Sequence, residues 1–211
     1  MIHATDLKGT FYILNKKDRT PIIFIHGVGL DHSIWDPQIN AFDNTVLIYD
    51  ILGHGKTPLN KNDLSFDDFS NQILNLMDEL KFNKVHLVGF SIGSLIARNF
   101  ASRFNDRLAS LTLLCSIFNR SDKEQKIVND RFEQTKKDHK LTKDALKRWF
   151  TEDYLNKNPK TKEKIKSILD KNDMTNFLKV YQLFVEHKDN EEFNKIKTKT
   201  LVITGEENVG S

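Results

Sequence analysis

The first 116 residues alternate short apolar runs with amphipathic stretches, and this alternation restricts the fold more than any other feature. Four apolar runs carry a strand signal, at residues 21–25, 45–49, 85–88 and 111–114. Such short, nearly continuous runs are typical of parallel strands buried on both faces. Residues 66–80 carry apolar side chains at helical spacing after an acidic first turn, which predicts an amphipathic helix. The pattern favours βαβ units and an α/β fold with a mostly parallel sheet.

The pattern of apolar and charged residues changes near residue 120. Up to residue 195, apolar residues recur at three- and four-residue intervals among Lys, Glu and Asp, which predicts several helices. A strand pattern returns at residues 200–204. A helical block between two strands of a parallel sheet is the anatomy of a cap over an active site. The expected organisation is therefore a core, a helical cap and a return to the core, at residues 1–119, 120–195 and 196–211.

Length and composition narrow the class of protein. A chain of 211 residues favours one domain with an insertion. No segment approaches the roughly 18 uninterrupted apolar residues of a membrane helix, and the N-terminus lacks a signal-peptide pattern. A single cysteine, Cys115, rules out an internal disulfide and a cysteine-based metal cluster. We expect a cytoplasmic protein without a membrane partner, a metal or a cofactor.

The charge distribution argues against a dedicated nucleic-acid binder. The chain has 32 basic and 29 acidic residues, a net charge of +3. The basic excess lies between residues 117 and 199, where 21 Lys and Arg face 15 Asp and Glu. A solvated helical surface accounts for most of this excess, and a bias toward anionic small-molecule ligands is the other interpretation. The sequence indicates no oligomeric state.

The strongest motif is Gly89-Phe90-Ser91-Ile92-Gly93, which follows a strand pattern and opens a helical one. In G-x-S-x-G the serine occupies a strained turn between strand and helix, where a Cβ at either glycine would clash with neighbouring backbone. The serine hydroxyl is thereby presented at the tip of the sheet. We interpret Ser91 as a nucleophile.

Two glycine-rich turns end the first two strand patterns. The turn at residues 26–29, His-Gly-Val-Gly, lets backbone approach a ligand closely. We expect the amides of Val28 and Ile92 to donate to one oxygen as an oxyanion hole. His26 is interpreted as stabilising this turn rather than as a base, and the turn at residues 50–57 as structural.

Together these strings resemble the α/β-hydrolase superfamily. The runs that resemble its 3-oxoadipate enol-lactonase branch are HGVGLDHSIWDPQ, YDILGHGKT, GFSIGS, Arg148-Trp149-Phe150 and TLVITGEENVGS. The resemblance spans essentially the whole chain. It implies a serine hydrolase of carboxylic esters or lactones, with a histidine base, an acid and a helical cap. Carried over by position, the substrate-binding candidates are Gly27, Trp35, Arg148 and Trp149.

The triad departs from the pattern of that family at two places. Asn208 stands where the acid is expected, and an amide accepts a hydrogen bond from imidazole without stabilising the imidazolium. Glu206 and Glu207 remain alternative acids. The catalytic histidine of the family follows the acid, whereas all seven histidines of this chain precede Asn208.

We therefore expect these 211 residues to be an incomplete hydrolase chain, without its last strand, last helix and catalytic histidine, and inactive by itself. Two alternatives stay open. One is a non-catalytic ligand-binding homologue, which Asn208 would permit. The other is a different reaction of the same serine, such as carbon–carbon bond hydrolysis or perhydrolysis.

Overall fold

The computed structural model describes residues 1–139, 142–189, 191–206 and 208, and within them one seven-stranded sheet. The strands are β1 (Ile2–Thr5), β2 (Phe11–Asn15), β3 (Arg19–Ile25), β4 (Asn44–Tyr49), β5 (Val85–Phe90), β6 (Leu108–Leu114) and β7 (Thr200–Ile203). Their order across the sheet is β1-β2-β4-β3-β5-β6-β7. Pairing is parallel from β4 to β7 and antiparallel for β1 and β2. The predicted α/β fold with a mostly parallel sheet is confirmed.

The antiparallel pair β1 and β2 was not predicted from the sequence. Strand β1 is short and mostly exposed, so it lacks the apolar run by which a buried strand is recognised. Strand β2 has four buried residues but is only five residues long. These two strands extend the sheet on the side away from β5, and the strands that carry the predicted motifs remain near its centre.

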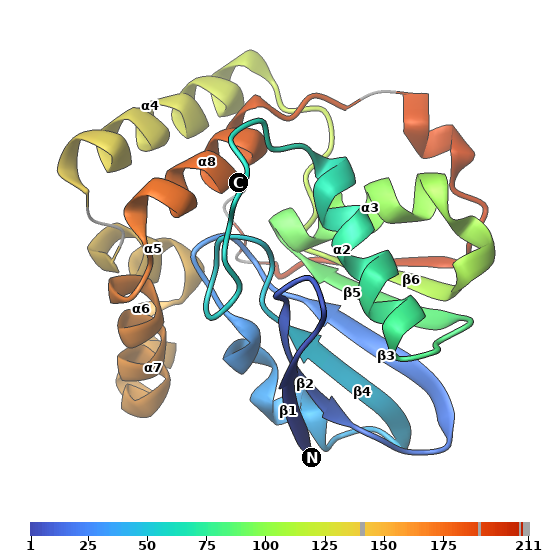
Figure 1. Cartoon of the computed structure of the whole chain (residues 1–211). Helices are drawn as coiled ribbons and strands as arrows, with labels where there is room; N and C mark the ends of the chain where they lie inside the picture. The colour runs from blue at the N-terminus through green and yellow to red at the C-terminus, as the bar shows by residue number, and fades with distance from the viewer. Residues whose placement is uncertain (140–141, 190, 207, 209–211) are drawn as a thin grey trace.

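The helices fall into two groups in Figure 1: α2 and α3 lie beside the sheet, and α4 to α8 form a separate cluster of helices. The helical elements are η1 (His32–Trp35), α1 (Asp36–Ile39), α2 (Phe66–Glu79), α3 (Ile92–Arg103), η2 (Asn105–Arg107), α4 (Asp122–Asp138), α5 (Thr142–Trp149), α6 (Glu152–Lys157), α7 (Pro159–Asp170), α8 (Met174–Glu186) and η3 (Glu191–Lys195). Helix α2 starts at a capping box between Ser65 and Asp68. It confirms the predicted amphipathic helix to within one residue.

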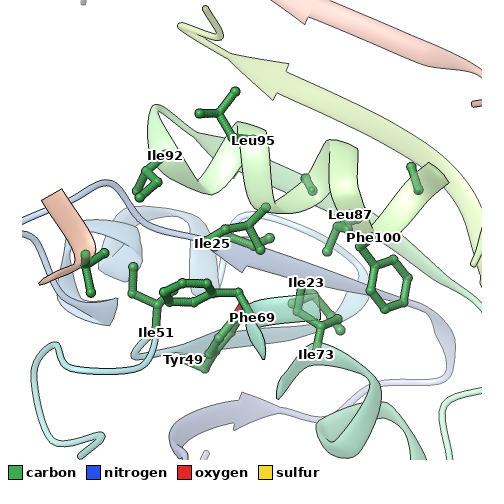
Figure 2. Close-up of a cluster of buried hydrophobic side chains, with 14 of the residues drawn as sticks. Ile23, Ile25, Tyr49, Ile51, Phe69, Ile73, Leu87, Ile92, Leu95 and Phe100 are labelled. Atoms are coloured by element: carbon green, nitrogen blue, oxygen red, sulfur yellow. The ribbon is translucent and has the colours of Figure 1, made fainter. Parts of the chain in front are cut away.

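The two faces of the sheet carry separate apolar clusters, because successive side chains of a strand point to opposite faces. Ile23 and Ile25 of β3 belong to the cluster with Phe69 of α2 and Phe100 of α3, as Figure 2 shows. The intervening Phe24 lies in the second cluster, with its ring centroid 4.9 Å from that of Trp35. The central strands are thus buried on both faces, as their continuous apolarity predicts.

The α4–α8 segment lies between β6 and β7 in the chain. Helices α4 and α8 run side by side in Figure 1 and join through the rings of Phe132 and Tyr181, whose centroids are 5.5 Å apart. Helices α5 to α7 share a third apolar cluster with Leu30, which follows β3. The predicted helical block is confirmed. None of the described helices combines the length and apolarity that crossing a membrane would need.

Strand β7 forms one edge of the sheet, and all four of its residues are exposed. The exposed fractions of its apolar side chains are 55% for Leu201, 63% for Val202 and 47% for Ile203. An exposed apolar edge strand offers unpaired backbone groups and apolar surface to a second chain. This edge is therefore the most prominent feature favouring self-association in the described part of the chain.

We predict that the 211-residue protein self-associates through β7 and that Val202→Lys reduces this association, because a charged edge side chain opposes strand addition. Sedimentation velocity over a range of concentrations measures the effect. Asn75→Lys adds the same charge on an exposed position of α2 and should leave the association unchanged. A monodisperse wild-type monomer with a cooperative thermal transition would contradict the prediction.

Candidate active site

Ser91 is the single residue between strand β5 and helix α3, and its backbone is strained. Its φ of 55° and ψ of −121° lie outside the regions that a residue with a side chain adopts readily. A backbone of this kind costs about 1–3 kcal/mol and persists only where its surroundings enforce it. The turn places Ser91 at the carboxyl end of the parallel strands, and its hydroxyl makes no hydrogen bond within the described residues.

The surroundings that enforce this turn are the two flanking glycines. A Cβ built on Gly89 would lie 2.1 Å from the carbonyl oxygen of Gly93. A Cβ built on Gly93 would lie 2.6 Å from the carbonyl oxygen of Ile25 and 2.7 Å from that of His26. All three distances are shorter than real contacts of a Cβ atom. The clash with neighbouring backbone predicted from the motif is therefore present, and it brings α3 against the end of β3.

The turn at residues 26–29 lies directly beside Ser91. Strand β3 pairs in parallel with β5, with Ile25 opposite Gly89, so the residues after each strand emerge next to one another. A Cβ built on Gly27 would lie 3.4 Å from the Cβ of Ser91 and 3.2 Å from the ring of Phe90. A side chain at Gly27 would occupy the space beside the serine.

Two backbone amides flank the serine. Val28 belongs to the turn after β3, and Ile92 is the first residue of α3. Neither amide donates to a protein acceptor within the described ranges. The Ile92 amide also lies at the positive end of the α3 dipole, where negative charge is stabilised. The arrangement has the free donors that an oxyanion requires, and their role in catalysis remains a prediction.

A buried polar network lies beneath the turn that contains Val28. The amide of Gly29 donates to Nε2 of His54 over 2.9 Å, and the amide of Ile51 donates to Nε2 of His26 over 3.1 Å. The carboxylate of Asp50 accepts from the backbone amide of His32 over 2.8 Å. These bonds join the 26–29 turn to the 50–57 turn and hold the backbone around Val28 in place.

Burial sets the protonation states in this network. It lowers the pKa of His54 to about 3 and also lowers that of His26, so both rings are neutral at pH 7. Burial alone would raise the pKa of Asp50, but the hydrogen bonds from His32 and from the backbone amide of Lys56 lower it. Burial alone would lower the pKa of His32, but the hydrogen bond to Asp50 raises it. Asp50 is therefore a buried carboxylate whose partners are supplied by the chain.

The α7–α8 turn also contacts the turn that contains Val28. Asn172 donates from Nδ2 to the carbonyl oxygen of Gly29 over 2.8 Å. Phe177 of α8 and Leu169 of α7 lie 3.2 and 3.3 Å from the position of a Cβ on Gly29. The helical segment therefore holds this turn together with His54, whose ring meets that of Phe177 edge-on at 6.3 Å.

The other substrate-binding candidates lie in different surroundings. Trp35 is 7% exposed, packs on Phe24, and its indole N–H has no partner within the described residues. Trp149 ends α5 and is 39% exposed. Arg148 is half-buried. Burial raises the pKa of Tyr181 on α8, and the positive charge of Arg148 opposes that rise.

Asn208, at the position of the expected acid, is exposed. Its backbone amide donates to the carbonyl oxygen of Gly205 over 3.1 Å, and its Nδ2 donates to Oγ1 of Thr204 over 3.0 Å. The alternative acid Glu206 is also exposed. Glu207, the other alternative, lies outside the described residues. Neither described residue contacts a histidine through a hydrogen bond in the ranges that the structure covers.

All seven histidines lie in the described ranges, at positions 3, 26, 32, 54, 86, 139 and 187. Their side-chain hydrogen bonds go to backbone groups, to Asp50 and to Ser110, and none goes to Ser91. His187 approaches only Asp189 among the described acids, at 3.5 Å. The strained serine thus has no hydrogen-bonded base among these histidines.

The supporting roles of His54, Asp50 and Asn172 were not predicted from the sequence. The string of residues 50–57 did carry a signal, since a histidine between two glycines after a strand can reach a neighbouring turn. Asn172 carried no such signal, because its partner Gly29 is 143 positions away in the sequence.

The fold and this turn define the class of protein. Residues 20–208 match the family model described as alpha/beta hydrolase fold, and the chain belongs to that family.

Several relatives within the family are similar over nearly the whole chain. The (E)-2-((N-methylformamido)methylene)succinate hydrolase of Acinetobacter baylyi is 26% identical over 96% of this chain and 78% of its own length. The 3-oxoadipate enol-lactonase 2 of the same species is 22% identical over 96% and 76%. The enol-lactonase of Burkholderia xenovorans LB400 superposes with a TM-score of 0.85 at 25% identity, over 97% of this chain and 81% of that one. The chain is therefore similar to hydrolases near the enol-lactonase branch.

We predict that His54 makes stability depend on pH. Its folded pKa of about 3 lies below the ordinary 6.5, so between these values the unfolded chain binds a proton that the folded chain excludes. Stability is complete above pH 6.5 and falls toward pH 3, by up to about 1.4 kcal/mol per pH unit for one group. Urea unfolding of His54→Asn should show a flatter dependence, whereas His3→Asn at an exposed position should keep the wild-type slope. An unchanged slope in His54→Asn would refute the assignment.

Proposed function

We propose that this protein is a serine hydrolase that acts on a carboxylic ester or lactone, with Ser91 as nucleophile. The observation that carries the proposal is the strained backbone of Ser91 between two glycines, beside the free amides of Val28 and Ile92. Backbone strain without a structural purpose is costly, and it clusters at functional sites. The similar hydrolases and enol-lactonases support the same reaction class.

In this mechanism the Ser91 oxygen attacks the substrate carbonyl carbon while the hydroxyl proton passes to a base. The carbonyl oxygen becomes an oxyanion, which accepts from the Val28 and Ile92 amides. Collapse breaks the ester C–O bond and leaves the acyl group on Ser91, and the leaving oxygen takes the proton. Water then attacks the acyl group and releases the acid. No metal or cofactor takes part in these steps.

The base is the part of this mechanism that the described histidines do not supply. A neutral serine hydroxyl is a poor nucleophile at pH 7 without one. Asn208 would also weaken a triad, since an Asp→Asn change in serine proteases lowers kcat by about 10⁴. We propose that the 211 residues lack the catalytic histidine and hydrolyse esters poorly by themselves.

The α4–α8 segment is proposed to be the cap that shapes the substrate pocket. It contacts the turn with Val28 through Asn172 and contributes Arg148 and Trp149. Gly27 lies next to Ser91, and a side chain there would press on the ring of Phe90. Trp35 packs on β3 and β4 within the second apolar cluster. A cationic side chain in the cap favours a substrate that bears a carboxylate. The names of the succinate hydrolase and the 3-oxoadipate enol-lactonase are consistent with such a substrate.

A non-catalytic ligand-binding protein is the second candidate, and two observations favour it. Asn208 occupies the place of the acid, and none of the described histidines contacts Ser91. Such a protein would keep the pocket and the free amides but would not acylate Ser91. Reaction of Ser91 with an acylating or phosphonylating reagent separates the two candidates.

The first test is fluorophosphonate labelling in the presence of imidazole. We expect slow labelling of the 211-residue protein, accelerated at least about tenfold by imidazole, because a general base contributes about 10²- to 10⁴-fold. Ser91→Ala should abolish the labelling. Ser102→Ala, which removes another hydroxyl from α3, should not alter it. Mass spectrometry identifies the modified residue, and labelling that survives in Ser91→Ala or never responds to imidazole would reject the serine mechanism.

The second test concerns the carboxylate of the substrate. Arg148→Gln should weaken binding of adipate about tenfold, since a hydrogen bond to a charged group contributes about 1.5–3 kcal/mol. Lys147→Gln, at the neighbouring exposed position, is the matched control and should bind adipate as the wild type does. Isothermal titration calorimetry measures both. Equal affinities in all three proteins would exclude Arg148 from carboxylate recognition.

A further inference from the structure

Arg98 is a buried cation on the helix that begins at the candidate nucleophile. It lies on α3, and only 7% of its side chain is exposed. Burial lowers its pKa to about 10, and the charge of Asp189 opposes this change, so the guanidinium remains charged at pH 7. A buried guanidinium requires nearby acceptors to offset the loss of hydration. The positions of its acceptors therefore show which segments of the chain Arg98 holds together.

The acceptors come from both ends of the α4–α8 segment. Arg98 donates from Nη1 to the carbonyl oxygen of Ile117 over 2.7 Å, just before α4. Its Nη2 pairs with the carboxylate of Asp189, just after α8, and that carboxylate is 9% exposed. The other oxygen of Asp189 accepts from the amide of Asn119 over 2.7 Å. One ion pair thus joins the two places where the chain enters and leaves the segment.

Aromatic rings close the same junction. The guanidinium of Arg98 lies over the ring of Phe193 in η3, 3.4 Å from its centroid. The ring of Phe118 meets Phe193 edge-on at 5.3 Å. A planar guanidinium can stack on a ring and bind a carboxylate and a carbonyl in one plane, whereas a lysine ammonium cannot. Arginine is therefore the side chain that fits the groups at this junction.

We infer that Arg98 and Asp189 are a positioning pair that holds both ends of the α4–α8 segment on α3 and thereby sets the distance between the cap and Ser91. The segment has a second attachment at the turn with Val28, through Asn172 and Phe177. One attachment is on the turn after β3, and the other is on α3, the helix that follows β5. We call the residues just before α4 (117–119) and just after α8 (Asp189) the hinge segments. The effect of the pair on substrate binding rests on the function proposed above, whereas its effect on the position of the hinge segments does not.

Stability alone does not account for this pair. Replacing a buried ion pair by apolar residues of similar volume is often neutral or stabilising, whereas removing one partner costs about 3–5 kcal/mol. An apolar pair, however, has no donor for the carbonyl of Ile117 and no acceptor for the amide of Asn119. The pair therefore specifies where the two hinge segments lie, and this property can be measured separately from folding stability.

The test combines thermal unfolding with hydrogen exchange in the full 211-residue chain. Arg98→Met should lower Tm and speed exchange of the amides at residues 117–119 at least about tenfold, because Asp189 is left buried and unpaired. The double variant Arg98→Met/Asp189→Leu should recover most of the Tm but keep the fast hinge exchange. Exchange in α2 should match the wild type in the double variant. Arg103→Met, which removes a partly exposed ion pair from the same helix, should change neither the Tm substantially nor the hinge exchange.

A double variant that recovers both the Tm and the hinge protection would overturn the inference. Should Arg98→Met fail to fold, Asp189→Asn takes its place, since it retains an oxygen acceptor for Asn119 while removing the charge. Intermediate hinge exchange in Asp189→Asn supports the inference, and wild-type exchange contradicts it.

The link to the active site is tested by the concentration dependence of imidazole-assisted fluorophosphonate labelling. In the double variant the fluorophosphonate concentration that gives half of the maximal labelling rate should rise about tenfold. The maximal rate should change little, since the pair acts on the cap and not on Ser91. An equal loss of maximal rate would contradict a positioning role. If wild-type Ser91 is not labelled at all, the serine mechanism fails while the hinge measurements still decide the role of the pair.

Discussion

The candidate site depends above all on the contact of Gly93 with the carbonyl oxygens of Ile25 and His26. This contact brings the first turn of α3 against the end of β3, so that Ser91 lies beside the turn that contains Val28. Any side chain at position 93 would push the helix away and separate Ser91 from that turn. The unusual backbone of Ser91 is thus enforced by the packing of its neighbours, and a serine in a relaxed turn would not present its oxygen in this way.

The parts of the site that could be predicted from the sequence are those formed by residues that are consecutive in the chain. Ser91, Val28 and Ile92 lie in short glycine-rich strings directly after apolar strand patterns, and the parallel sheet brings such strings to one edge. The antiparallel β1 and β2 were not predicted, because they are short and β1 is mostly exposed. The bonds of His54 and Asn172 to Gly29 were not predictable either, because they join positions 25 and 143 residues apart. Local patterns contain no information on such pairs.

Three polar side chains buried around the site, those of Asp50, His54 and Arg98, each bind a group from another segment of the chain. Asp50 accepts from the residues that follow β3, and His54 accepts from the amide of Gly29. Arg98 binds both ends of the α4–α8 segment. A buried polar group without a partner is costly, so each of these bonds penalises any movement that would break it. The apolar clusters make the fold stable, and these few polar contacts determine the relative placement of its parts.

The hydrogen bond from Asn172 to the carbonyl of Gly29 links the evolution of the helical segment to that of the serine turn. Such segments vary in length and sequence more easily than the strands beneath them. A replacement segment taken from another member of the family would leave the Gly29 carbonyl without its donor unless it carried an amide at an equivalent place. A graft of helices that is meant to change substrate preference must therefore keep an asparagine at this position. Asn172 is required there although it is neither the predicted nucleophile nor a predicted oxyanion donor.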